Sequence, residues 1–158
     1  MKTLLWSLIV ACAVISAPVD AQNNSTDMNM QILRDKLRAD KKLIVAANMR
    51  LTDAEAKAFW PLYDAYQNDL KAINLRLGNG IVTYADAYAA NTIDDAMAKR
   101  LLDESVAIDE SEARLRKDFA SKLMNALPAT KAVRYLQIES KIRAAVRYEI
   151  AANIPLVE

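Results

Sequence analysis

Carboxylates are the main candidates for acid–base chemistry, because the 158-residue sequence contains no histidine. Histidine is the usual general base and the commonest metal ligand, so the sequence lacks the residue that most often fills either role. Four carboxylates cluster in one predicted helix: Glu104, Asp109, Glu110 and Glu112. Arg114, Arg116 and Lys117 follow at salt-bridge spacing. Since a catalytic pair needs unlike environments that separate its pKa values, we interpret this cluster as ordinary surface ion pairing.

No other pattern marks a catalytic centre or a metal site. The sequence lacks the dense Asp-x-Asp-x-Asp-Gly loop that is specific for calcium. The methionines after Met1 are scattered, which is typical of core filling rather than of a copper site. A Ser or Thr nucleophile would need a lysine as its base, and nothing marks such a dyad. We therefore predict no catalytic residue, no cofactor and no metal, and a protein that is not an enzyme.

The last predicted helix is rich in basic and aromatic side chains. They are Lys131, Arg134, Lys141, Arg143 and Arg147, with Tyr135 and Tyr148 between them. Glu139 and Glu149 dilute the charge, and the whole chain is nearly neutral, with 21 basic and 20 acidic side chains. This balance indicates no nucleic-acid partner. We interpret the face as a solvated flank that also favours acidic partner surfaces.

The N-terminus has the pattern of a cleavable secretory signal. Lys2 is followed by an uninterrupted apolar run from Leu4 to Ser16 that is shorter than the roughly 20 residues of a membrane span. Pro18 ends the run, and Val19-Asp20-Ala21 suits a cleavage site. We predict a signal peptide over residues 1–21, cleavage after Ala21 and a periplasmic protein without a membrane span. A minor alternative is a lipid anchor at Cys12, which is the only cysteine.

The rest of the sequence predicts helices only. Residues 22–27 are polar and predicted to be disordered, and residues 28–153 are predicted to form a single all-helical domain. The expected helices cover 28–49, 53–77 with a kink near Pro61, a short segment 81–90, 93–126, and 128 to about 153. Gly78-Asn79-Gly80 is expected to end the second helix, and Thr92 with Asp95 to cap the long one. The apolar positions of the long helix follow a near-heptad spacing: Met97, Leu101, Ile108, Leu115, Phe119 and Leu123.

These helices are long for so small a chain. A helix of about 34 residues spans roughly 50 Å at 1.5 Å per residue. Such a protomer buries its core poorly alone. The predicted fold is therefore all-α, an elongated antiparallel helical hairpin of four to five helices that forms an intertwined homodimer.

Two helix starts carry a family resemblance. Leu51-Thr52-Asp53-Ala54-Glu55 resembles the Leu-Thr-x-x-Gln signature of the Spy/CpxP-like family of periplasmic proteins. Thr52 and Glu55 also match a capping box, in which each residue bonds the backbone of the other. Leu127-Pro128-Ala129-Thr130-Lys131 stands where the family has a second copy. The chain departs from both copies: Glu55 replaces the first Gln, and Pro128 and Lys131 replace the second Thr and Gln.

The resemblance implies a curved, intertwined dimer that acts as an ATP-independent chaperone or an envelope-stress protein for unfolded or envelope clients. One alternative is a structural or adaptor protein that binds one specific envelope partner. A lesser alternative is a metal-responsive protein, although that branch of the family uses histidine. The motif residues are interpreted as helix-start architecture rather than as a binding site: Leu51, Thr52, Glu55, Leu127, Pro128 and Lys131.

Overall fold

The computed structural model describes residues 39–157, and this part of the chain is all-helical without a strand. Residues 39–49 are helical, followed by α2 (Asp53–Ala89), α3 (Asp95–Ala126) and α4 (Ala129–Asn153). The prediction of an all-α fold is confirmed for these residues. The predicted signal peptide, Cys12, the polar segment 22–27 and the part of the first predicted helix over residues 28–38 lie outside the described part.

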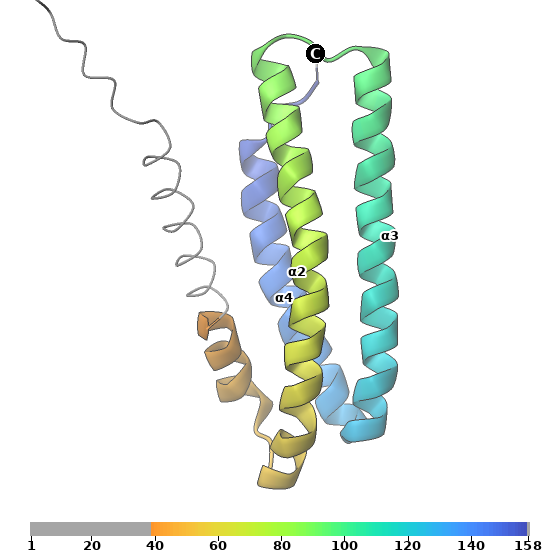
Figure 1. Ribbon diagram of the computed structural model, residues 1–158. Helices are drawn as coiled ribbons and strands as arrows, with labels where there is room; N and C mark the ends of the chain where they lie inside the picture. Colours follow the sequence, from red (N-terminus) through yellow and green to blue (C-terminus); the bar gives the residue numbers. More distant parts are fainter. Residues whose placement is uncertain (1–38, 158) are drawn as a thin grey trace, which may run out of the picture. The chain divides into compact units, whose positions relative to one another are not determined.

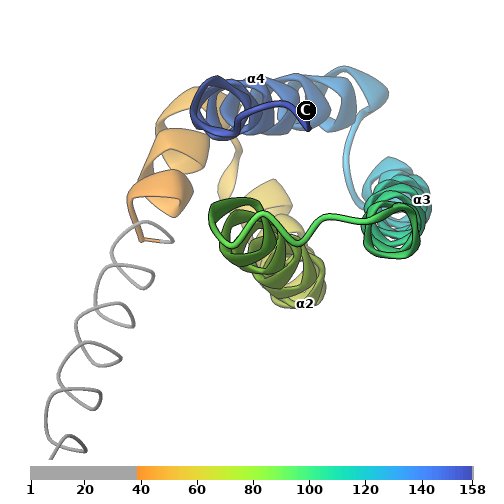
Figure 2. The same cartoon turned by 90° about the horizontal axis from the view of Figure 1, so that it is seen from above.

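Residues 43–158 form one compact unit, which contains all three long helices. Figure 1 shows α2 and α3 running in opposite directions, with α4 returning in the direction of α2. Viewed from above, the three helices occupy the corners of a triangle, and α4 lies across the other two at a tilt (Figure 2). This arrangement leaves one side of α3 facing α2 and another side facing α4.

Local side-chain chemistry explains where the helices begin. The capping box predicted at α2 is present: Glu55 N donates to Thr52 Oγ1, and Thr52 N donates to Glu55 Oε2 at 2.7 Å. At α3 the predicted cap pair of Thr92 and Asp95 is wrong, because Asp94 is the cap and its Oδ1 accepts from Met97 N at 2.7 Å. Pro128 precedes the first residue of α4 as its cap, so that helix begins one residue later than predicted.

The second predicted helix and the short segment after it are in fact one helix. α2 continues through Pro61 and also through Gly78-Asn79-Gly80, where a helix end was predicted. Neither glycine has a positive φ, so the left-handed backbone expected there is absent. Half-buried Leu77 and Ile81 and buried Ala87 keep this part of α2 packed. Tertiary packing therefore outweighs the glycine cost of about 1 kcal/mol per residue.

Aromatic rings dominate the core. Tyr66 of α2 stacks on Phe119 of α3 with ring centroids 4.2 Å apart, and Tyr135 of α4 meets Phe59 edge to face at 5.2 Å. Met49 is also buried in this cluster. One ring from each of the three long helices therefore fixes the bundle at a common point.

A polar network lies inside this core. Glu139 is only 2% exposed, and its Oε2 accepts from Tyr135 Oη at 3.1 Å and from Gln67 Nε2 at 3.4 Å. No buried side-chain nitrogen or oxygen in the described residues lacks a hydrogen-bond partner. Since an unsatisfied buried polar group is costly, this network makes the helix register specific.

Candidate functional site

The six residues singled out by the family resemblance gather at one end of the described bundle, as parts of two helix starts. Leu51 packs against the core and Leu127 is buried in it. Glu55 and Lys131, the fourth residues after Leu51 and Leu127, form an ion pair. The hydrogen bond from Lys131 is the largest of the effects that hold the pKa of Glu55 below its usual 4.5. These residues join helices, and their side chains line neither of the grooves described below.

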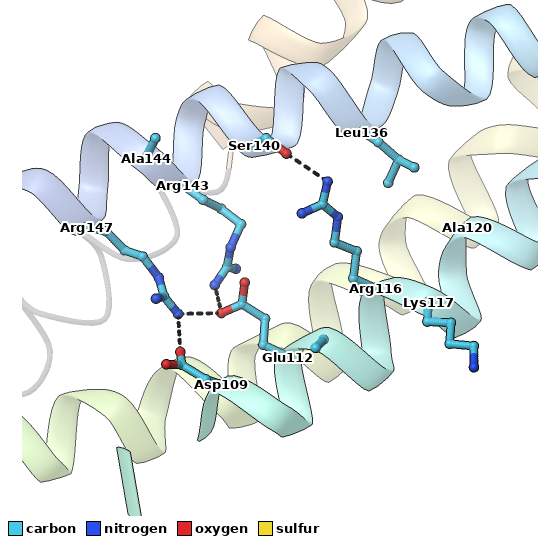
Figure 3. Close-up of a pocket in the computed structure, with 11 residues that line it drawn as sticks. Asp109, Glu112, Arg116, Lys117, Ala120, Leu136, Ser140, Arg143, Ala144 and Arg147 are labelled. Atoms are coloured by element: carbon cyan, nitrogen blue, oxygen red, sulfur yellow. Dashed lines mark hydrogen bonds and ion pairs between the residues drawn. The ribbon is translucent and has the colours of Figure 1, made fainter. Parts of the chain in front are cut away.

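A surface groove with a volume of about 610 Å³ lies between α3 and α4. Its floor is formed by small or apolar side chains, with Ala113 and Ala120 from α3 and Leu136 and Ala144 from α4. Figure 3 shows charged side chains from both helices reaching across it. A second hollow continues along the same two helices past Val133 and Lys141. We call the two together the α3–α4 groove.

Ion pairs close one part of this groove. Glu112 of α3 pairs with Arg143 of α4, and both side chains are 16% exposed. Arg147 bridges Glu112 at 3.0 Å and Asp109 at 2.7 Å (Figure 3). Burial lowers the pKa of Arg143, and the attraction of nearby groups, including Asp109, only partly opposes this shift. The acidic charge of the groove is therefore already matched by two arginines.

The other part of the groove is cationic. Arg116 reaches from α3 to α4, where its Nη2 donates to Ser140 Oγ at 3.1 Å (Figure 3). Lys117 and Lys141 lie beside it on the two walls. Within residues 39–157, no carboxylate forms an ion pair with any of these three cations. Their charge is thus available to a ligand or a partner.

Exposed apolar side chains extend the floor of the groove. On α3, Leu102 is 64% exposed, Val106 50% and Met124 53%, and on α4 Val133 is 51% exposed. Helical spacing of 100° per residue puts Leu102, Val106 and Met124 on the same side of α3 as Ala113 and Ala120. A line of apolar groups therefore runs along the side of α3 that borders the groove, next to the unmatched cations.

The predicted pairing of the carboxylate cluster is only partly right. Glu110 pairs within its own helix with Arg114, at 3.8 Å. Glu104 instead pairs with Arg76 of α2 at 2.9 Å, which lowers the pKa of Glu104. Asp109 and Glu112 pair with α4, as described above. Three of the four carboxylates thus connect helices, through Arg76 of α2 and through Arg143 and Arg147 of α4.

The basic side chains predicted to form a solvated face on the last helix also fall into two groups: those that bond to other parts of the chain and those that do not. Lys131 pairs with Glu55, and Arg134 Nε donates to the Asn48 carbonyl at 2.5 Å. Arg143 and Arg147 pair with α3, whereas Lys141 remains at the edge of the groove. Most of the basic side chains expected to form a solvated flank therefore make contacts within the fold.

Several groove residues were not identified as functional from the sequence. Arg116 was considered only as an ion-pair partner, and Leu102, Val106 and Met124 were not separated from the general apolar pattern. The available signal was a second apolar line on α3, about 100° away from the core stripe of Ile108, Phe119 and Leu123. Ser140 carries no sequence signal, because its role depends on which residue faces it.

The described residues contain no group of three or more Cys, His, Asp or Glu placed to hold a metal ion. None of the helices in residues 39–157 is both long and apolar enough to cross a bilayer. Comparison with protein-family models, with curated proteins and with solved structures finds no match for the chain.

Proposed function

We propose that this protein is an exported, non-enzymatic binding protein that holds unfolded protein segments without ATP. The observation that carries the proposal is the line of exposed apolar side chains beside unmatched cations in the α3–α4 groove. Unfolded clients expose apolar groups that are buried in their native states. Apolar surface of this kind binds them weakly through loss of water contact, and basic groups at its edge attract acidic clients from a distance.

The setting of this activity is part of the proposal. The N-terminal pattern and the Spy/CpxP-like helix starts support a periplasmic protein cleaved after Ala21, with a role in envelope stress. We further propose an elongated antiparallel hairpin protomer and an intertwined homodimer. In that dimer, the exposed apolar groups of α3 would border a shared surface.

An aggregation assay tests the proposal. A reduced, unfolded acidic protein such as α-lactalbumin is incubated with a several-fold molar excess of this protein, without ATP, and light scattering is followed. We expect scattering to rise more slowly than with an equal mass of an inert protein. Unchanged scattering, together with capture of a single stoichiometric envelope partner, would instead select the structural or adaptor alternative.

A further inference from the structure

The α3–α4 groove combines two features that the contacts within the chain leave unused. One is the cationic group formed by Arg116, Lys117 and Lys141, for which the described residues supply no carboxylate. The other is the apolar floor beyond Arg116, which is lined by Ala120 of α3 and by Leu136 and Val133 of α4. A ligand that complements both features has one anionic group attached to one apolar chain.

We infer that the groove binds a single-chain anionic amphiphile of the fatty-carboxylate class, with its head group at Arg116 and Lys141 and its chain along the apolar floor between Ala120 and Val133. Arg116 is held ready for this role, because Ser140 Oγ accepts from its Nη2 at 3.1 Å and fixes the guanidinium across the groove (Figure 3). A guanidinium binds a carboxylate through two parallel N–H donors, which a single hydroxyl partner leaves largely available.

The dimensions and the polarity of the groove agree with an acyl chain. Beyond the cations, its α4 wall extends from Ser140 to Val133, which is roughly 10 Å at 1.5 Å per residue and is comparable to a short extended acyl chain. The ion pairs of Glu112 with Arg143 and Arg147 close the opposite end of the groove. A chain that runs from the cations away from those ion pairs, past Leu136 to Val133, meets mainly apolar side chains.

A peptide fits the hollow itself less well than the exposed apolar line of α3 beside it, because Leu102, Val106 and Met124 lie outside the two hollows. Its backbone N–H groups require acceptors, but Asp109 and Glu112 already accept from arginines. The remaining charged side chains of the groove, Arg116, Lys117 and Lys141, can only donate. An acyl chain brings no polar groups that need partners. The inference stands apart from the client-binding proposal, since amphiphile binding requires no anti-aggregation activity.

Calorimetric titration with dodecanoate, below its micelle concentration, tests the inference on protein expressed from the full chain. We expect one site per chain, with affinity that rises from octanoate to dodecanoate. Acetate supplies the charge without the chain, and dodecyl maltoside supplies the chain without the charge. Both should bind more weakly than dodecanoate.

The decisive variant is Arg116→Gln with Lys141→Gln, which should weaken dodecanoate binding about tenfold and leave dodecyl maltoside unchanged. The matched control is Lys71→Gln with Lys122→Gln, two exposed lysines that line neither part of the groove, and it should bind as the parent does. Circular dichroism checks that both variants keep their helix content. Equal loss in both variants, or no binding of dodecanoate, would overturn the inference. Tighter binding of phosphatidylglycerol vesicles or of an acidic apolar peptide, lost in the same variant, would also overturn it.

Discussion

Glu55, near the start of α2, and Lys131, near the start of α4, form an ion pair that joins two helix starts 76 positions apart in the chain. Their side chains are 17% and 26% exposed, respectively. Both residues stand at the glutamine position of the Leu-Thr-x-x-Gln pattern. The two departures from that pattern are therefore in direct contact, and each supplies the charge that the other needs.

This contact predicts that the two positions are coupled in stability. Glu55→Gln and Lys131→Gln should each lower the free energy of unfolding, because each leaves one charged partner unmatched in a partly buried position. The double variant, which has glutamine at both positions, should lose less than the sum of the two single changes. Urea unfolding of the four proteins measures the coupling. Strictly additive losses would contradict an interaction between the two side chains.

The same contact predicts a dependence of stability on pH. Lys131 holds the pKa of folded Glu55 below its usual value of 4.5, so the stabilising contribution requires ionised Glu55. That contribution is fully present above the unfolded pKa, which is the usual value of 4.5, and is lost as the pH falls through the lower folded pKa. The difference in unfolding free energy between the parent and Glu55→Gln should thus be constant near neutral pH and shrink in acid. A difference that grows on acidification would contradict the assignment.

The ion pair of Glu112 and Arg143 predicts a larger effect on the free energy of unfolding. Glu112→Gln preserves the side-chain shape but leaves Arg143, which is 16% exposed, without its carboxylate. We expect a loss on the order of 2 kcal/mol in the free energy of unfolding, somewhat less than for a fully buried pair. Glu110→Gln is the control, because Glu110 is 65% exposed and should cost under about 0.5 kcal/mol. Similar losses for both variants would show that the pair between α3 and α4 contributes no more to stability than an exposed pair within one helix.

The continuity of α2 is open to a simple substitution test. Gly78 and Gly80 lie inside the helix without a positive φ, and a Cβ built at either position meets no atom within 4 Å. Gly78→Ala and Gly80→Ala should therefore each stabilise the protein by about 0.5–1 kcal/mol. If the helix ended there in a left-handed turn, as the sequence first suggested, alanine would destabilise the protein instead. Thermal and urea unfolding distinguish the two signs.

The sequence predicts local structure of this protein better than contacts between helices. The capping box of Thr52 and Glu55 lies within four residues, so its chemistry is complete in the printed sequence. Gly78-Asn79-Gly80 looks like a helix end by the same local criteria, yet packing on both sides of it keeps α2 intact. Propensity is a weak guide wherever tertiary contacts contribute more than about 1 kcal/mol.

The candidate site was harder to predict, because its residues acquire their roles from another helix. Glu112 interrupts the heptad pattern of α3, and nothing nearby in sequence indicates that Arg143 will match it. Arg116 has carboxylates within its own helix, whereas its structural partner is Ser140 of α4. Such pairings depend on how α3 and α4 align, which helical periodicity alone does not determine.

The most direct test of client binding compares two matched double variants in the aggregation assay. Leu102→Ser with Val106→Ser removes two exposed apolar groups, 64% and 50% exposed, from the side of α3 that borders the groove. Leu75→Ser with Val82→Ser removes a similar pair, 44% and 59% exposed, from α2 outside the groove. We expect the α3 variant to lose most of its ability to slow aggregation, while the α2 variant and the parent protect the client equally. Equal protection by all three proteins, with unchanged helix content, would contradict the proposal that this surface holds unfolded clients.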